Sequence, residues 1–223
     1  MNLFADAFAY ILDNWSSGTA PLETLVRQHL WYSLLAVLGA AAIAVPLGLL
    51  VGHTHKGEIV LIGMVNALRA LPTLGLLTLL VLVMKTIGLG PPLIALIVAG
   101  IPPLLAGTYA GLVSVDRNVV DAARAMGMTE SQILFRVEVP NGLPLILGGL
   151  RSAALQVIAT ATVAAYVNLG GLGQPIFSGI ALRNYDRVLA AAILVAALAV
   201  VVDGLLALAV RASVPGRPLL ARR

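Results

Sequence analysis

Five long apolar stretches determine what this chain can fold into. Each reaches the roughly 20 residues that an α-helix needs to cross a lipid bilayer. Inside hydrocarbon the backbone N–H and C=O groups find no water, so such stretches form helices that satisfy these groups internally. The sequence therefore predicts an all-α, polytopic membrane protein whose spans cover residues 30–52, 59–84, 93–113, 145–166 and 188–210.

The composition supports this class of protein. Of the 223 residues, 60% are hydrophobic and 11% are charged, which is typical of a chain that lies mostly in a membrane. The spans take up most of the length, so no large soluble domain fits. We expect an N-terminal interfacial segment at 1–29, a transmembrane domain at 30–210 and a basic cytoplasmic tail at 211–223.

The N-terminal segment is not a typical signal peptide, because it lacks a basic start and carries Asp6 and Asp13. One side of it is apolar and consists of Phe4, Phe8, Ile11, Leu12 and Trp15. We interpret this stripe as a helix that lies at the membrane surface. The alternative is a contact site for an extracellular binding protein.

The second apolar stretch, residues 59–84, contains Asn66 and Arg69 and is interrupted by Leu71 and Pro72. A charged residue inside a span costs roughly 3 kcal/mol unless it is paired or wetted. Arg69 therefore faces protein, water or the cytoplasmic headgroups, either by snorkelling or by lining a pathway. The stretch is one span, two short spans or a broken helix, so the chain has five or six spans.

Two further polar residues, Gln156 and Thr160, lie in the alanine-rich fourth span. Such side chains either hold helices together by hydrogen bonds or face a polar conduit. Under the second interpretation the pathway-lining candidates are Asn66, Arg69, Gln156 and Thr160. After this span, residues 168–187 form a polar outer loop, in which Gly170, Gly171 and Gly173 permit a tight re-entrant turn.

The longest polar interruption, residues 113–144, carries seven charged side chains: Asp116, Arg117, Asp121, Arg124, Glu130, Arg136 and Glu138. Asn118 is a candidate helix N-cap, and Gly127 ends that helix. Thr129 and Gln132 form a capping box for a second helix, which Pro140 ends by pushing the preceding residue out of the helical conformation. The segment predicts two short helices about a glycine corner, outside the bilayer. The first helix has an apolar side at Val119, Val120, Ala123 and Met126.

This segment resembles the EAA loop of ABC-importer permeases, whose pattern is Glu-Ala-Ala, three residues, Gly, nine residues and Ile-x-Leu-Pro. The corresponding residues here are Asp121-Ala122-Ala123, Gly127 and Val137-x-Val139-Pro140. The spacing matches throughout; the departures are Asp for Glu at 121 and Val for Ile and Leu at 137 and 139. Over roughly residues 28–204 the chain is similar to the osmoprotectant branch, which imports glycine betaine, choline or carnitine.

The resemblance implies a type I ABC-importer fold like that of methionine permeases, in the bacterial inner membrane. It also implies a second permease subunit of the same or a related chain, a cytoplasmic ABC ATPase and an extracytoplasmic substrate-binding protein. Small Ala122 and Ala123 would seat in a groove of the ATPase, Asp121 would meet a basic residue there, and Gly127 would set the angle between the helices. The coupling residues would be Asp121, Ala122, Ala123, Arg124, Met126, Gly127 and Pro140.

The basic residues orient the chain, since cytoplasmic segments of membrane proteins are enriched in Lys and Arg. If the 113–144 loop is cytoplasmic and Arg69 is not counted, nine basic residues lie on the cytoplasmic side: Lys56, Arg117, Arg124, Arg136, Arg151, Arg211, Arg217, Arg222 and Arg223. Four are outside: Arg27, Lys85, Arg183 and Arg187. Five spans then place the N-terminus outside and the C-terminus inside.

The sequence contains no phosphate-binding G-x-x-x-x-G-K-[ST] motif, so we expect a transport subunit that binds no cofactor and leaves ATP hydrolysis to its partner. His29, His53 and His55 lack the surrounding carboxylates or cysteines of a metal site. Aromatic residues make up only 5%, too few for a cage around a quaternary ammonium ion. Two alternatives stay open: a permease for methionine, another amino acid or an oxyanion, and a stand-alone secondary transporter or channel.

Overall fold

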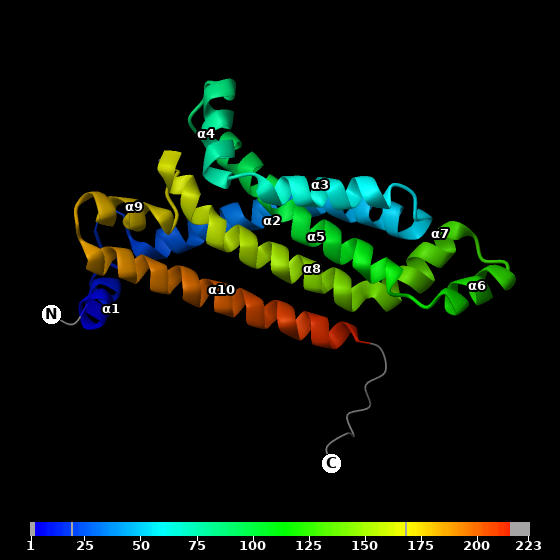
Figure 1. The fold of residues 1–223 in the computed structure, drawn as a ribbon. Coiled ribbons are helices and arrows are strands. Elements are labelled where there is room, and N and C mark those ends of the chain that lie inside the picture. Colours follow the sequence, from blue (N-terminus) through cyan, green and yellow to red (C-terminus); the bar gives the residue numbers. More distant parts are fainter. Residues whose placement is uncertain (1–2, 19, 168, 215–223) are drawn as a thin grey trace, which may run out of the picture.

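The computed structural model describes residues 3–18, 20–167 and 169–214, and over this part of the chain it is entirely helical (Figure 1). In chain order the elements are α1 (Leu3–Asp13), α2 (Leu22–Thr54), α3 (Glu58–Ala70), α4 (Thr73–Met84), α5 (Gly90–Val113), α6 (Arg117–Ala125), α7 (Glu130–Ile133), the π-helical turn η1 (Leu134–Glu138), α8 (Val139–Thr160), the 3₁₀ helix η2 (Ala161–Val167), α9 (Gly173–Ala181) and α10 (Tyr185–Ser213). The all-α prediction is confirmed.

Among the residues that the structure describes, four helical runs are long and apolar enough to cross a membrane: α2, α5, α10 and the continuous run Glu130–Val167. The pair α3 and α4 passes the same test only together, and the two helices meet at an angle of 86°. The bend follows from Pro72, because Leu71 before it adopts an extended conformation with φ −71° and ψ 122°. The second apolar stretch is therefore a broken helix, one of the three alternatives that its sequence allowed.

The helices alternate in direction, so the molecule has two ends (Figure 1). One end holds α6, α7 and the C-terminal ends of α2 and α10, and the other holds α1 and α9. This arrangement places the charged loop and the end of α10 on one side, as the orientation based on basic residues requires. Arg211 lies in the last turn of α10, whereas Arg217, Arg222 and Arg223 fall outside the described residues.

Helix α2 begins at Leu22, eight residues before the predicted span, because its first turns have their own apolar core. Leu22 and Leu25 pack with Leu172, which follows the predicted glycine turn. Trp31 and Tyr32, which come at the start of the predicted span 30–52, therefore lie well inside α2. The predicted N-terminal helix is present as α1, with Phe4, Phe8 and Leu12 exposed; its position at the membrane surface stays a prediction.

The glycine turn predicted in the outer loop is confirmed. Gly170 and Gly171 have φ angles of +86° and +69°, a conformation that glycine adopts without steric cost. Gln28 fixes the turn to α2 by accepting a hydrogen bond from the Gly171 N–H at 3.1 Å. Gly173 then begins α9, so the predicted polar loop at 168–187 contains a helix that the sequence did not indicate.

The centre of the molecule is held together by small residues that let helices approach closely. On α5 and α8, Gly107 faces Gly149 and Gly111 faces Gly142; a Cβ atom on Gly107 would lie 2.4 Å from the Cα of Gly149. Helix α2 presents a second small-residue face towards α5. Its buried members are Ser33, Ala36, Ala40, Ala44, Gly48 and Gly52.

Candidate coupling loop and membrane pocket

Helix α6 begins two residues earlier than the sequence predicted. The N-cap is Asp116, whose carboxylate accepts a hydrogen bond from the Asn118 N–H at 2.9 Å. The prediction that Asn118 is the cap is therefore wrong. Both residue types cap helices well. Asp116 is the N-cap because its backbone is extended, whereas Asn118 already lies inside the helix.

The predicted apolar side of α6 is divided between two environments. Val120 and Ala123 are buried against Ile133 of α7, and Ala123 is only 2% exposed. Val119 and Met126 face outward, and Met126 is 75% exposed. Ala123 is therefore unavailable to a partner and instead holds the two loop helices together, whereas Ala122 and Met126 remain accessible.

The corner between the loop helices has the predicted form. Gly127 has φ +81°, the left-handed conformation that commonly ends helices. Thr129 and Gln132 make both hydrogen bonds of the predicted capping box at the start of α7. The turn holds α6 against α7, so the loop is a compact helical corner.

Pro140 does not end the second loop helix, contrary to the prediction. Val139 before it is helical, with φ −60° and ψ −47°, and Pro140 lies in the first turn of α8. The π-helical turn η1 explains this, because the Val139 N–H bonds to the Leu134 carbonyl, five residues back. A wider turn accommodates the proline ring that would clash in an α-helix. The second loop helix thus runs directly into the fourth span.

A chain of charged side chains ties the loop to the end of α2. His53 lies between two carboxylates: its Nδ1 is 2.5 Å from Glu138 and its Nε2 is 3.2 Å from Glu130. Arg124 donates from Nε and Nη2 to the two oxygens of Glu130, at 2.9 and 3.1 Å, and from Nη1 to Asp121 at 3.3 Å. The sequence showed no carboxylate cluster near His53 and so missed this network, because Glu130 and Glu138 are distant from it along the chain.

The charges in this network shift each other's proton affinities. Hydrogen bonding to Glu130 raises the pKa of Arg124, and the Arg124 guanidinium lowers the pKa of Glu130 below its ordinary value of 4.5. Because the carboxylate pKa is lower in the folded loop, the pair stabilises the loop above about pH 4.5 and is lost as the pH falls through the lowered pKa. Both side chains are well exposed, so the stabilisation is small.

Replacing His53 by alanine is expected to loosen the loop while the spans stay folded. Glu138 is only 5% exposed, and a buried polar group without a partner costs about 1–3 kcal/mol. Hydrogen–deuterium exchange in α6 and α7 should therefore rise by about tenfold or more. The matched control is His55→Ala, since the exposed His55 makes no side-chain hydrogen bond to a described residue. Equal exchange in the two variants would contradict the role of His53.

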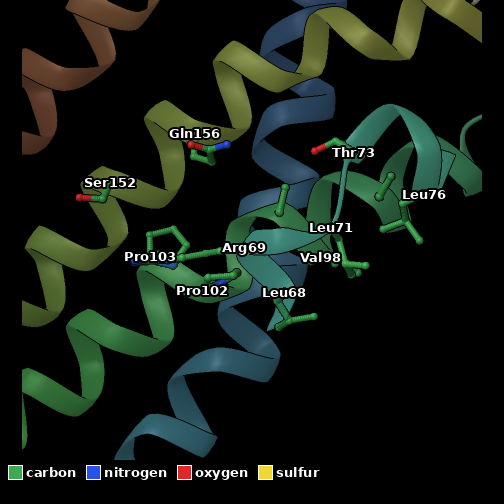
Figure 2. Close-up of a pocket in the computed structure, with 12 residues that line it drawn as sticks. Leu68, Arg69, Leu71, Thr73, Leu76, Val98, Pro102, Pro103, Ser152 and Gln156 are labelled. Atoms are coloured by element: carbon green, nitrogen blue, oxygen red, sulfur yellow. The ribbon is translucent and has the colours of Figure 1, made fainter. Parts of the chain in front are cut away.

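The break between α3 and α4 opens a pocket of about 310 Å³ against α5 and α8 (Figure 2). Arg69 lies at the end of α3, and Gln156 extends from α8, so two of the four pathway candidates line one pocket. The other residues of the lining are Leu68, Leu71, Thr73, Leu76, Ala95, Val98, Ala99, Pro102, Pro103 and Ser152. Ser152 precedes Gln156 by one helical turn, a spacing that was available in the sequence.

The other two pathway candidates are absent from this lining. Asn66 is exposed on α3, one turn before Arg69. Thr160 donates its hydroxyl to the Gln156 carbonyl of its own helix at 2.6 Å. This bond lies within one helix, and the lining of a polar conduit by Thr160 stays a prediction.

A second ion pair lies between two spans. Arg151 of α8 donates to both carboxylate oxygens of Asp203 on α10, at 2.5 and 2.6 Å. Such two-point contacts between arginine and a carboxylate are stronger than single hydrogen bonds. The pair neutralises two charges that would otherwise be costly beside lipid. The sequence places both residues towards the cytoplasmic side, but it does not indicate that they meet.

Comparison with known proteins identifies relatives for this arrangement. The family described as "Binding-protein-dependent transport system inner membrane component" matches residues 44–213. The carnitine transport permease protein OpuCB of Listeria monocytogenes is 40% identical, over 79% of this chain and 80% of that protein. The choline transport system permease protein OpuBB of Bacillus subtilis is 34% identical over 84% and 86%. The osmoprotectant import permease protein OsmW of Salmonella typhimurium is 34% identical over 90% and 94%.

Solved structures support the fold. The inward-facing methionine ABC transporter MetNI matches with a TM-score of 0.77 and 23% identity, over 86% of this chain and 95% of that chain. An amino acid ABC transporter with histidines matches with a TM-score of 0.71 and 18% identity, over 94% and 98%. The predicted type I ABC-importer fold is confirmed. The family match spans most of the chain and includes the charged loop, the pocket and the closely packed glycines. This chain therefore belongs to the family of binding-protein-dependent transport system inner membrane components, as the membrane permease subunit of a bacterial ABC importer.

Proposed function

We propose that this chain imports osmoprotectants such as glycine betaine, carnitine or choline. With a second permease subunit, of the same or a related chain, it forms the path across the membrane. The relatives named above include permeases for carnitine and choline and an osmoprotectant import permease. The observation that carries the mechanism is the helical run Glu130–Val167, which joins the charged loop to the pocket that contains Gln156.

The exposed side of the loop is the docking surface for a cytoplasmic ABC ATPase. Val119, Met126 and Phe135 are exposed there, and apolar side chains outside the bilayer favour contact with another protein. Asp121 remains accessible beside them and is available to a basic residue of the partner. ATP is bound and hydrolysed in that partner chain, so this subunit is not an enzyme and needs no cofactor of its own.

The transport cycle follows from this connection. When ATP closes the ATPase dimer, the bound loop moves with it, and α7 carries the displacement through η1 into α8. The spans then change from inward-open to outward-open, and the pocket at the α3–α4 break changes its exposure. An extracytoplasmic binding protein delivers the cargo to the outer side, where α1 and α9 lie.

The test is to purify the chain with its cognate ATPase and binding protein and to reconstitute the complex in liposomes. We expect ATP hydrolysis to rise when the binding protein is loaded with glycine betaine, carnitine or choline, together with uptake of that solute. Stimulation by methionine, another amino acid or an oxyanion instead would show that the chain is an ABC-importer permease with a different cargo. Uptake by the purified chain alone, without ATP, would make it a secondary transporter and refute the proposal.

A further inference from the structure

Arg69 lies in the lining of the pocket at the α3–α4 break and differs in its contacts from Arg124 and Arg151. Arg124 and Arg151 each bind a carboxylate through two nitrogen atoms. Arg69, by contrast, makes neither an ion pair nor a side-chain hydrogen bond with any residue in 3–18, 20–167 or 169–214. It lies one residue before the break, inside the segment that forms the broken span. A guanidinium at that position needs water or an anion to offset the cost of its charge.

The pocket around Arg69 has a definite chemical character. Arg69 is the one residue of its lining with a formal charge, and the polar side chains of Thr73, Ser152 and Gln156 share the lining. The lining includes no acidic residue and no aromatic residue. A pocket of about 310 Å³ is at the lower end of the range of small-molecule sites, about 300–1,000 Å³. It therefore suits a small anionic group and offers nothing that attracts a bare cation.

These properties separate the cargoes named for the relatives. Glycine betaine and carnitine carry a carboxylate as well as a quaternary ammonium group, whereas choline carries the ammonium group and a neutral hydroxyl. A guanidinium binds a carboxylate through two parallel hydrogen bonds and repels a cation. A quaternary ammonium group is held well by aromatic faces, which this lining lacks. A pocket that binds the carboxylate end of the cargo but not its ammonium end holds the cargo weakly. Weak binding lets the cargo leave, as a transport path requires.

We propose that Arg69 binds the carboxylate of the cargo in this pocket, so that the permease itself favours zwitterionic quaternary ammonium compounds over choline. This proposal rests on the proposed function, and it adds a second step of selection to that of the binding protein. Gln156 and Ser152 add polar side chains to the same lining from α8 (Figure 2).

The experiment uses the reconstituted complex of permease, ATPase and binding protein, with each cargo supplied at a concentration that saturates the binding protein. The maximal uptake rate then reports on steps within the membrane. For Arg69→Gln and Arg69→Met we expect glycine betaine and carnitine uptake to fall about tenfold or more, while choline uptake is unchanged or higher. Arg69→Lys keeps the charge without the paired geometry and should fall between wild type and these variants.

Arg211→Gln is the matched control, since Arg211 is exposed at the end of α10, away from the pocket. Basal ATP hydrolysis and the amount of assembled complex show whether each variant folds. If either Arg69→Gln or Arg69→Met does not fold, the other still tests the loss of the charge. Equal loss of all three cargoes, or no change in glycine betaine and carnitine uptake, would overturn the role of Arg69. If the wild-type complex moves none of the three, the proposed function fails and the proposal for Arg69 falls with it.

Discussion

Leucine in place of Gly107 is expected to prevent the spans from assembling. A Cβ atom there would lie 2.4 Å from the Cα and 2.9 Å from the N of Gly149, and these backbone atoms cannot rotate away as a side chain can. Overpacking a tight interior costs about 1–3 kcal/mol or more. For a side chain as large as leucine we expect almost no folded protein in the membrane, measured as monodisperse protein after detergent extraction.

The neighbouring glycines of α8 supply a matched comparison for milder substitutions. A Cβ atom on Gly149 would lie 2.8 Å from the Gly107 Cα, whereas one on Gly148 meets nothing within 4 Å. Gly149→Ala is expected to lower the apparent Tm. Gly148→Ala should leave it unchanged or raise it, because alanine favours a helix over glycine by about 1 kcal/mol. Equal effects at the two positions would refute close packing of α5 on α8.

Aspartate in place of Met126 is expected to disconnect the permease from its ATPase. Met126 follows the last residue of α6 and is 75% exposed, so the substitution leaves the loop folded while it places a charge in the proposed docking surface. Loss of an apolar contact at the centre of an interface costs about 2 kcal/mol or more, roughly a 30-fold weaker affinity. Cargo-dependent ATP hydrolysis at low ATPase concentration should fall by at least that factor.

The control for Met126 is Leu182→Asp. Leu182 is 70% exposed, but it follows α9 at the opposite end of the molecule (Figure 1). The same chemical change there should leave ATPase binding intact. Normal coupling in the Met126 variant, with the ATPase bound at wild-type affinity, would show that the docking surface lies elsewhere.

The parts of the fold that sequence predicted are those encoded by local signals. Apolar runs define α2, α5 and α10, and the Thr129–Gln132 capping box and Gly127 act within a few residues of their own positions. Leu71 and Pro72 indicated the break that shapes the pocket. These signals were sufficient to recover the long spans and the loop corner, but not α9.

The parts that sequence missed depend on contacts between distant residues. His53 and Glu138 are 85 positions apart, and Arg151 and Asp203 are 52 apart, so no local pattern connects them. The Asn118 and Pro140 predictions were wrong because a nearby Asp116 and a π-helical turn gave the backbone better alternatives. The sequence placed Ala123 on the apolar side of its helix, but only the packing of α6 on α7 shows that Ala123 is covered by this chain and not by a partner.

The uninterrupted helix from Glu130 to Val167 has a consequence for the timing of transport. Gln156 follows Glu130 by about 26 residues, or about 39 Å at 1.5 Å per residue. Every residue between them is helical, so the loop and the pocket are joined without a flexible linker, and the π-helical turn η1 is the place where the helical pattern changes. Fluorescent reporters on α7 and α8 should therefore respond to ATP binding at the same rate.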